Sequence, residues 1–188
     1  MGSVMLPITT QPTPPGINTA SSWAHVGITQ AIGLGLVPPS LQNYYTNNTT
    51  RAEFAALAVA LYETATGREI TQRATFNDTN DVNVQKMGGL GVVTGVGGGN
   101  FNPNGTITRQ EAAVMIARLA NVVGQSFPIM ASTFADNAQI ADWATQSVGQ
   151  VQAAGIMGGV GNNLFNPTGQ FTREQSIITM LRLFDELS

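Results

Sequence analysis

Three short segments of this chain decide its fold: Thr50-Arg51-Ala52-Glu53, Thr108-Arg109-Gln110-Glu111 and Thr172-Arg173-Glu174-Gln175. Each one stands immediately before apolar residues at helical spacing. In each, a threonine is followed three residues later by Glu or Gln, which is the spacing of a capping box. The two side chains then satisfy each other's backbone N–H groups. We therefore predict that a helix begins at each segment, capped by the pairs Thr50 and Glu53, Thr108 and Glu111, and Thr172 and Gln175.

The arginine between the capping residues has no part in a capping box. We expect Arg51, Arg109 and Arg173 to point outward from the helix N-termini. There the free N–H groups and the positive end of the helix dipole favour anions. The alternative role for these arginines is an ion pair with Asp78 or Asp136 of a neighbouring repeat.

The segments belong to an internal repeat of about 60 residues, with two helices in each copy. One constant interval separates five pairs of residues: Gly91 and Gly155, Gly95 and Gly159, Phe101 and Phe165, Pro103 and Pro167, Arg109 and Arg173. The first copy follows the same plan more loosely, with Pro39 in place of the second glycine. We expect a flexible Pro-rich linker over residues 1–20, followed by repeats over 21–67, 68–124 and 125–188.

One helix pair of this size cannot bury its apolar stripe alone, so the three repeats must pack together. We predict a mainly α fold, in which three tandem helix–loop–helix repeats form one pseudo-threefold bundle with Gly-rich loops. The alternative packing is a linear solenoid. We favour closure because none of the three copies has the polar outer face of a capping repeat.

The composition excludes several classes of function. Hydrophobic residues make up 43% of the chain but charged residues only 10%, against about 25% in typical soluble domains. A net charge of −3 argues against nucleic acid as a partner, because no basic stripe exists to neutralise phosphates. No apolar run is long enough to predict membrane insertion.

Residues for metal or cofactor chemistry are also scarce. The chain has no cysteine and one histidine, His25, so we expect neither a zinc site nor a catalytic triad. The glycine run Gly95–Gly99 lacks the Lys-Ser/Thr ending of a phosphate-binding loop. Asp78–Asp81 resembles part of a calcium loop but lacks the required glycine and distal glutamate. We predict no catalytic residue, metal or cofactor.

The repeats resemble the S-layer homology motif. The third copy carries the resemblance in this order: Phe134-Ala135-Asp136, Trp143-Ala144, Gly155-Ile156-Met157-Gly158-Gly159, Phe165-Asn166-Pro167 and Thr172-Arg173-Glu174. The second copy shows Phe76-Asn77-Asp78, the Gly91–Gly95 segment, Phe101-Asn102-Pro103 and the second capping box, but no tryptophan. Gln175 stands where the family usually has Glu, which a capping box tolerates.

The resemblance implies a three-motif module that anchors proteins non-covalently to the bacterial cell envelope. Its implied partner is a cell-wall polysaccharide, either a pyruvylated secondary polymer or a peptidoglycan-linked glycan. The implied location is the bacterial cell surface or S-layer, after secretion by a signal peptide that is not part of this sequence. The implied ligand sites are grooves between adjacent repeats, and we expect one or two of the three to function.

The resemblance assigns ligand binding to the arginine of each segment, namely Arg51, Arg109 and Arg173. A pyruvate carboxylate suits a guanidinium at a helix N-terminus. Gly95 and Gly159 lie in loops that let a sugar approach the backbone. Trp23 and Trp143 offer stacking faces, although we favour core packing for both. Asp78 and Asp136 complete the candidate set through their expected pairing with the arginines.

The function predicted from these features is a non-catalytic, carbohydrate-binding anchoring module. The alternative is a structural envelope protein that assembles through protein–protein contacts, with possible self-association. An enzyme is a third possibility, which we rank below both because the repeats occupy nearly the whole chain.

Overall fold

The computed structural model describes residues 13–187. Its α-helices are α1 (His25–Gly33), α2 (Arg51–Thr66), α3 (Val82–Gly89), α4 (Arg109–Val122), α5 (Asp142–Ala153) and α6 (Arg173–Asp185). Short 3-10 turns lie at Ile17–Thr19, Ser22–Ala24, Pro39–Leu41 and Asn137–Gln139. Residues 13–187 contain isolated β-bridges but no β-strand, so the predicted mainly α class is confirmed.

All three predicted capping boxes are present, at the starts of α2, α4 and α6. At α2, the Thr50 hydroxyl accepts from the N–H of Glu53 at 3.1 Å, and the Glu53 carboxylate accepts from the N–H of Thr50 at 2.9 Å. Gln175 plays the same part at α6, where its Oε1 accepts from the N–H of Thr172 at 3.0 Å. The caps therefore fix where the second helix of each repeat begins.

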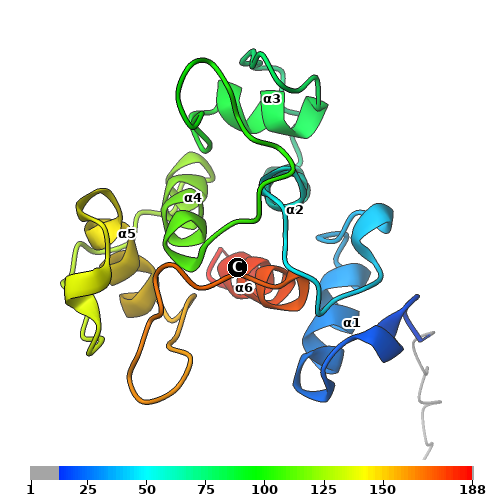
Figure 1. The fold of residues 1–188 in the computed structure, drawn as a ribbon. Helices are drawn as coiled ribbons and strands as arrows, with labels where there is room; N and C mark the ends of the chain where they lie inside the picture. Colours follow the sequence, from blue (N-terminus) through cyan, green and yellow to red (C-terminus); the bar gives the residue numbers. More distant parts are fainter. Residues whose placement is uncertain (1–12, 188) are drawn as a thin grey trace, which may run out of the picture.

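The helices pair across the boundaries between repeats. Helix α2 packs against α3, α4 against α5, and α6 against α1. Figure 1 shows α2, α4 and α6 at the centre of the molecule, with α1, α3 and α5 around them. The last helix therefore lies against the first, as a closed arrangement requires. The two helices pack closely at Gly27 of α1, because a Cβ added there would lie 2.3 Å from Cδ1 of Ile178 on α6.

A ring of backbone hydrogen bonds also closes the molecule. The N–H of Thr49 donates to the carbonyl of Phe171 at 2.8 Å. Ile107 donates to the carbonyl of Thr49 at 2.9 Å, and Phe171 donates to the carbonyl of Ile107 at 3.2 Å. Each of these residues precedes a capping threonine, so equivalent positions of the three repeats bond in a cycle. A linear solenoid would leave the last link open, and the cycle accords with the predicted pseudo-threefold bundle.

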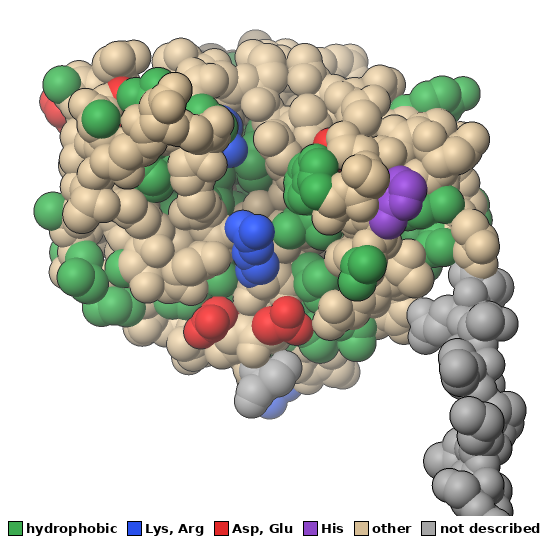
Figure 2. Space-filling model, turned by 90° about the horizontal axis from the view of Figure 1, so that it is seen from below, with side chains coloured by type: hydrophobic (Ala, Val, Ile, Leu, Met, Phe, Trp, Pro, Cys, Tyr) green, Lys and Arg blue, Asp and Glu red, His purple; other side chains and the backbone are tan. Residues whose placement is uncertain are grey.

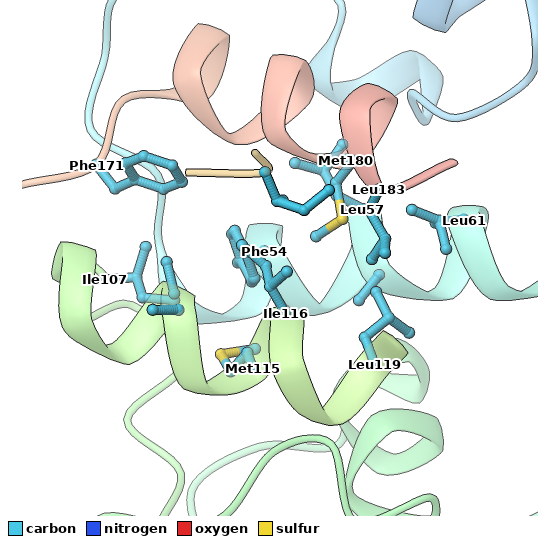
Figure 3. Close-up of a cluster of buried hydrophobic side chains, with 14 of the residues drawn as sticks. Phe54, Leu57, Leu61, Ile107, Met115, Ile116, Leu119, Phe171, Met180 and Leu183 are labelled. Carbon is cyan, nitrogen blue, oxygen red and sulfur yellow. The ribbon is translucent and has the colours of Figure 1, made fainter. Parts of the chain in front are cut away.

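The core lies where the three central helices meet. Figure 3 shows side chains from α2, α4 and α6 converging, among them Phe54, Ile116 and Leu183. These three side chains are fully buried. Ile107 and Phe171, from the segments that carry the hydrogen-bonded ring, close one end of the same cluster. The repeats therefore share one core, as their short amphipathic helices require.

The predicted linker, residues 1–20, is only partly covered, since residues 1–12 lie outside the described part. Residues 13–20 do not stand apart from the first repeat. Ile17 and Ala20 are partly buried against the core, and the Tyr45 hydroxyl donates to the carbonyl of Pro15 at 3.0 Å. Ile17 is part of the turn Ile17–Thr19, and its apolar side chain gives this segment a reason to pack.

Candidate functional site

The three arginines are buried, and the expectation that they point outward is wrong. Arg51, Arg109 and Arg173 are only 7%, 5% and 8% exposed. The side chains of Arg51 and Arg109 lie against a loop of the following repeat and donate hydrogen bonds to its backbone carbonyls. A guanidinium satisfies several such acceptors at once, which explains its burial beside a helix N-terminus.

Arg51 and Arg109 make the same contacts one repeat apart. Nε of Arg51 donates to the carbonyl of Phe101 at 2.9 Å, and Nη2 donates to that of Thr94 at 3.1 Å. Arg109 donates in the same way to Phe165 and Gly158, both at 2.6 Å. The guanidinium carbons lie 4.8 Å from the ring centre of Phe101 and 4.9 Å from that of Phe165, within cation–π range.

The alternative role of these arginines, an ion pair with Asp78 or Asp136, does not form among residues 13–187. Asp136 instead accepts from the N–H groups of Phe165 at 2.8 Å and Asn166 at 2.7 Å. Asp78 accepts from the equivalent groups of Phe101 and Asn102 at 2.8 and 2.7 Å. Burial alone would raise the pKa of Asp136, but backbone hydrogen bonds, led by these two, and the positive charge of Arg109 together lower it. The aspartates thus hold in place the loops whose carbonyls receive the arginines.

The ion pairs that do form use the capping-box glutamates. Arg51 Nη1 lies 2.9 Å from Glu111 Oε1, and Arg173 Nη2 lies 2.6 Å from Glu53 Oε1. Each glutamate therefore caps its own helix and neutralises an arginine of the preceding repeat in the cycle. The partner of Arg109 would be residue 175, which is Gln and carries no charge.

Both tryptophans are on the surface, so the core-packing role that we favoured is wrong. Trp23 is 57% exposed and Trp143 is 60% exposed. Each occupies the second position after the N-cap of its turn or helix, and the residue that follows it, Ala24 or Ala144, is fully buried instead. The two indole rings are therefore available to a ligand.

Two grooves bring the predicted residues together. The Arg51 groove has a volume of about 400 Å³ and is lined by Arg51, Thr94, Gly95, Glu111, Arg118 and Trp143, among others. The Arg109 groove has a volume of about 220 Å³ and is lined by Arg109, Gly158, Gly159, Gln175, Arg182 and Trp23, among others. Seen from below, the face between α1 and the loop after α5 is hollowed, and basic side chains lie in the hollow (Figure 2).

Sequence reasoning missed Arg118 and Arg182. They occupy equivalent positions of α4 and α6, at the same interval from Arg109 and Arg173, the first residues of those helices. Each enters the groove of the preceding repeat, so Arg118 faces Arg51 and Arg182 faces Arg109. Their repeated spacing could have indicated a shared role. It could not have indicated the groove, because the arginine at the start of each helix lines a different groove or interface from the second arginine on that helix.

The third interface, around Arg173, differs from the other two. Arg173 donates to the carbonyl of Asn43 and to Glu53, while its buried Nε has no hydrogen-bond partner among residues 13–187. The positions equivalent to the groove glycine, the second arginine and the tryptophan hold Pro39, Ala60 and Asn83. This interface therefore lacks the glycine, the second arginine and the tryptophan that line the other two grooves.

Other kinds of site find little support in the described residues. Residues 13–187 contain no group of three or more His, Cys, Asp or Glu side chains placed to hold a metal ion. Nε2 of His25 lies 3.1 Å from the carbonyl of Ala20. Within the same range, each helix is too short or too polar to cross a membrane.

Comparisons with known proteins point to one family. The model of the S-layer homology domain matches residues 83–113 and 133–175. The chain is 30% identical over 151 residues to an amylopullulanase of Thermoanaerobacterium thermosulfurigenes, covering 76% of this chain and 8% of that protein. It is 28% identical over 144 residues to the surface-layer 125 kDa protein of Lysinibacillus sphaericus, covering 73% and 12%. An exoglucanase of Acetivibrio thermocellus is also 28% identical, over 73% of this chain and 13% of that protein. The chain thus spans about a tenth of the length of these relatives.

Proposed function

Because the chain carries the S-layer homology domain, we propose that it is a non-catalytic anchoring module that binds cell-wall polysaccharide in its inter-repeat grooves. The domain is a cell-wall anchoring module of S-layer proteins, and surface-layer proteins stand among the relatives. The relatives that are named as enzymes match this chain over a small part of their length. The proposal places the protein at the bacterial cell surface.

One observation supports the proposal above the others: two arginines, a glycine-containing loop and an exposed tryptophan line each complete groove. Guanidinium groups bind carboxylates through charge-assisted hydrogen bonds. An indole ring offers a flat apolar face against which a sugar ring can stack. A polymer of neutral sugars with carboxylate substituents needs both kinds of group, and a pyruvate ketal supplies such a carboxylate.

Retention on purified cell wall tests this function. We expect the protein to bind wall material that carries a pyruvylated secondary polymer and to be lost from the same wall after the polymer is stripped. Equal retention on both materials would contradict the proposal.

A substitution in the Arg109 groove provides a second test of the proposed function. Arg182 is exposed on α6 and lines the Arg109 groove, so Arg182→Ala is expected to weaken retention about tenfold without unfolding the protein. Arg68→Ala is the matched control because Arg68 is exposed and lines neither groove. Equal losses for the two variants would indicate a nonspecific charge effect.

The assembly alternative predicts a different result. A protein that acts through protein–protein contacts would associate with increasing concentration in the absence of glycan. Sedimentation of the chain alone, before and after addition of the stripped polymer, separates the two functions.

A further inference from the structure

We propose that the Arg109 groove is the site that selects a carboxylate-bearing sugar, and that Gln175 gives it this selectivity. The inference rests on the proposed function and assigns the anionic part of the ligand to one groove. It follows from a difference in charge between the two complete grooves, since Glu111 lines one and Gln175 occupies the equivalent position of the other.

The difference begins at the capping position. Glu53 and Glu111 each cap a helix and pair with an arginine of the preceding repeat in the cycle, whereas Gln175 only caps. Oε1 of Gln175 accepts from the N–H of Thr172, which leaves its amide Nε2 as the end available to the groove. The Arg109 groove therefore has a neutral donor at the position where the Arg51 groove has a carboxylate.

The hydrogen bonds of the two arginines differ accordingly. Nε, Nη1 and Nη2 of Arg51 all donate, to Phe101, Glu111 and Thr94. In Arg109 only Nε and Nη2 donate, and Nη1 makes no hydrogen bond to any of residues 13–187. A side chain that is 5% exposed and lines a groove thus keeps an unpaired cationic donor. Arg173 Nε is the buried side-chain atom without a partner among residues 13–187, so Arg109 Nη1 is open to the groove and free to donate to a ligand.

The residues that line the two grooves also differ in charge, and the Arg109 groove is the more positive. The Arg51 groove has Arg51 and Arg118 against Glu111, and that glutamate forms an ion pair with Arg51. The Arg109 groove has Arg109 and Arg182, and none of the described residues that line it is acidic. An anion entering the Arg51 groove would meet a carboxylate, which repels it at short range. An anion entering the Arg109 groove would meet the guanidinium groups of Arg109 and Arg182 without an opposing carboxylate among its described lining residues.

A reciprocal exchange of the two capping residues tests the assignment. Gln175→Glu gives the Arg109 groove the carboxylate of its neighbour, and Glu111→Gln removes the carboxylate from the Arg51 groove. Both exchanges preserve the capping box, because Glu and Gln already perform that task at equivalent positions of this chain. The probes are a hexosamine glycoside that bears a pyruvate ketal and the same glycoside without the ketal, titrated by calorimetry.

We expect the unchanged protein to bind one equivalent of the ketal probe at least tenfold more tightly than the ketal-free probe. Gln175→Glu should weaken ketal binding about tenfold or more and leave ketal-free binding within about twofold. Glu111→Gln should create a second ketal site of comparable affinity. The melting temperature of each variant, measured in parallel, shows that the exchange has not unfolded the protein.

The outcomes separate this inference from the proposed function. If the unchanged protein binds stripped and unstripped wall equally, the anchoring function fails and this inference fails with it. If the protein binds the unstripped wall selectively but folded Gln175→Glu binds the ketal probe as tightly as the unchanged protein, only the role of Gln175 is overturned. Selective binding to the wall without any preference for the ketal probe would overturn the carboxylate assignment alone.

Discussion

Asp136 shows how one carboxylate at the residue scale supports a binding site that it does not line. Its two oxygens accept from the consecutive N–H groups of Phe165 and Asn166. The carbonyl of Phe165 is thereby held where Arg109 donates to it. The residue is 6% exposed, so these bonds have little competition from water.

Asp136→Asn is expected to lower the free energy of unfolding by about 2 kcal/mol, because an amide cannot accept with both of its atoms and the bonds lost are charge-assisted. The folded-state pKa of Asp136 is lowered, so its contribution is fully present above the unfolded pKa of about 3.9 and is lost as pH falls through the folded value. Stability should therefore fall below about pH 4 in the unchanged protein, and less steeply in the variant.

Thermal melting from pH 2 to pH 7 measures both effects. Asp185→Asn serves as the control, since Asp185 is exposed on α6 and no hydrogen bond of its side chain is present among residues 13–187. A variant with the same pH profile as the unchanged protein would show that Asp136 does not hold the loop.

At the residue scale, the capping residues could be predicted from the sequence, whereas the partners of the arginines could not. The capping residues were predicted because their partners are local, three residues away in the chain. The partners of the arginines were not, because the carbonyls of Phe101 and Phe165 come from another repeat. Because Arg109 is buried, Arg109→Ala removes one buried and one partly buried hydrogen bond and should destabilise the fold as well as weaken binding.

At the scale of elements, the loop between the two helices of a repeat depends on one glycine. A Cβ on Gly159 would lie 2.8 Å from the carbonyl oxygen of Leu164 and 3.3 Å from Cε1 of Phe134. The adjacent Gly158 has nothing within 4 Å of the same built position and does not have a positive φ. The backbone turns back on itself at this point, with Val160 donating to the carbonyl of Leu164 at 2.8 Å.

We expect Gly159→Ala to destabilise the protein by about 1–3 kcal/mol, because the crowded atom is backbone and cannot rotate away. Gly158→Ala should change stability by less than about 0.5 kcal/mol and is the matched control. Urea unfolding followed by circular dichroism measures both. Equal midpoints for the two variants would mean that the loop relaxes around the added methyl group.

Helix positions were predictable at this scale, whereas groove composition was not. Caps, apolar spacing and glycine stops are local signals, and all three capped helices begin where expected. Each groove instead draws its arginines and its tryptophan from different repeats. A sequence shows which residues recur, but the pairing of helices across repeat boundaries decides which of them meet.

The closed arrangement at the scale of the whole molecule has a consequence for how the chain unfolds. Helix α1 packs against α6 although the two lie at opposite ends of the sequence. In a linear solenoid, damage to the first helix would spread only to its neighbours in sequence. In the closed molecule, loss of packing at α1 also removes a partner of α6. It would weaken the cycle of backbone hydrogen bonds formed by Thr49, Ile107 and Phe171.

Ile28→Ala tests this coupling because Ile28 is fully buried on α1. The truncation should lower the free energy of unfolding by about 2–4 kcal/mol, as expected for a large-to-small change in a core. Hydrogen exchange of the α6 amides should accelerate together with that of α1, since the two helices form one packed pair. Val26→Ala, on the same helix at a position that is 80% exposed, should leave both rates unchanged. If α1 exchanges faster in Ile28→Ala while α6 keeps its full protection, the first and last repeats are not energetically joined and the molecule behaves as an open array.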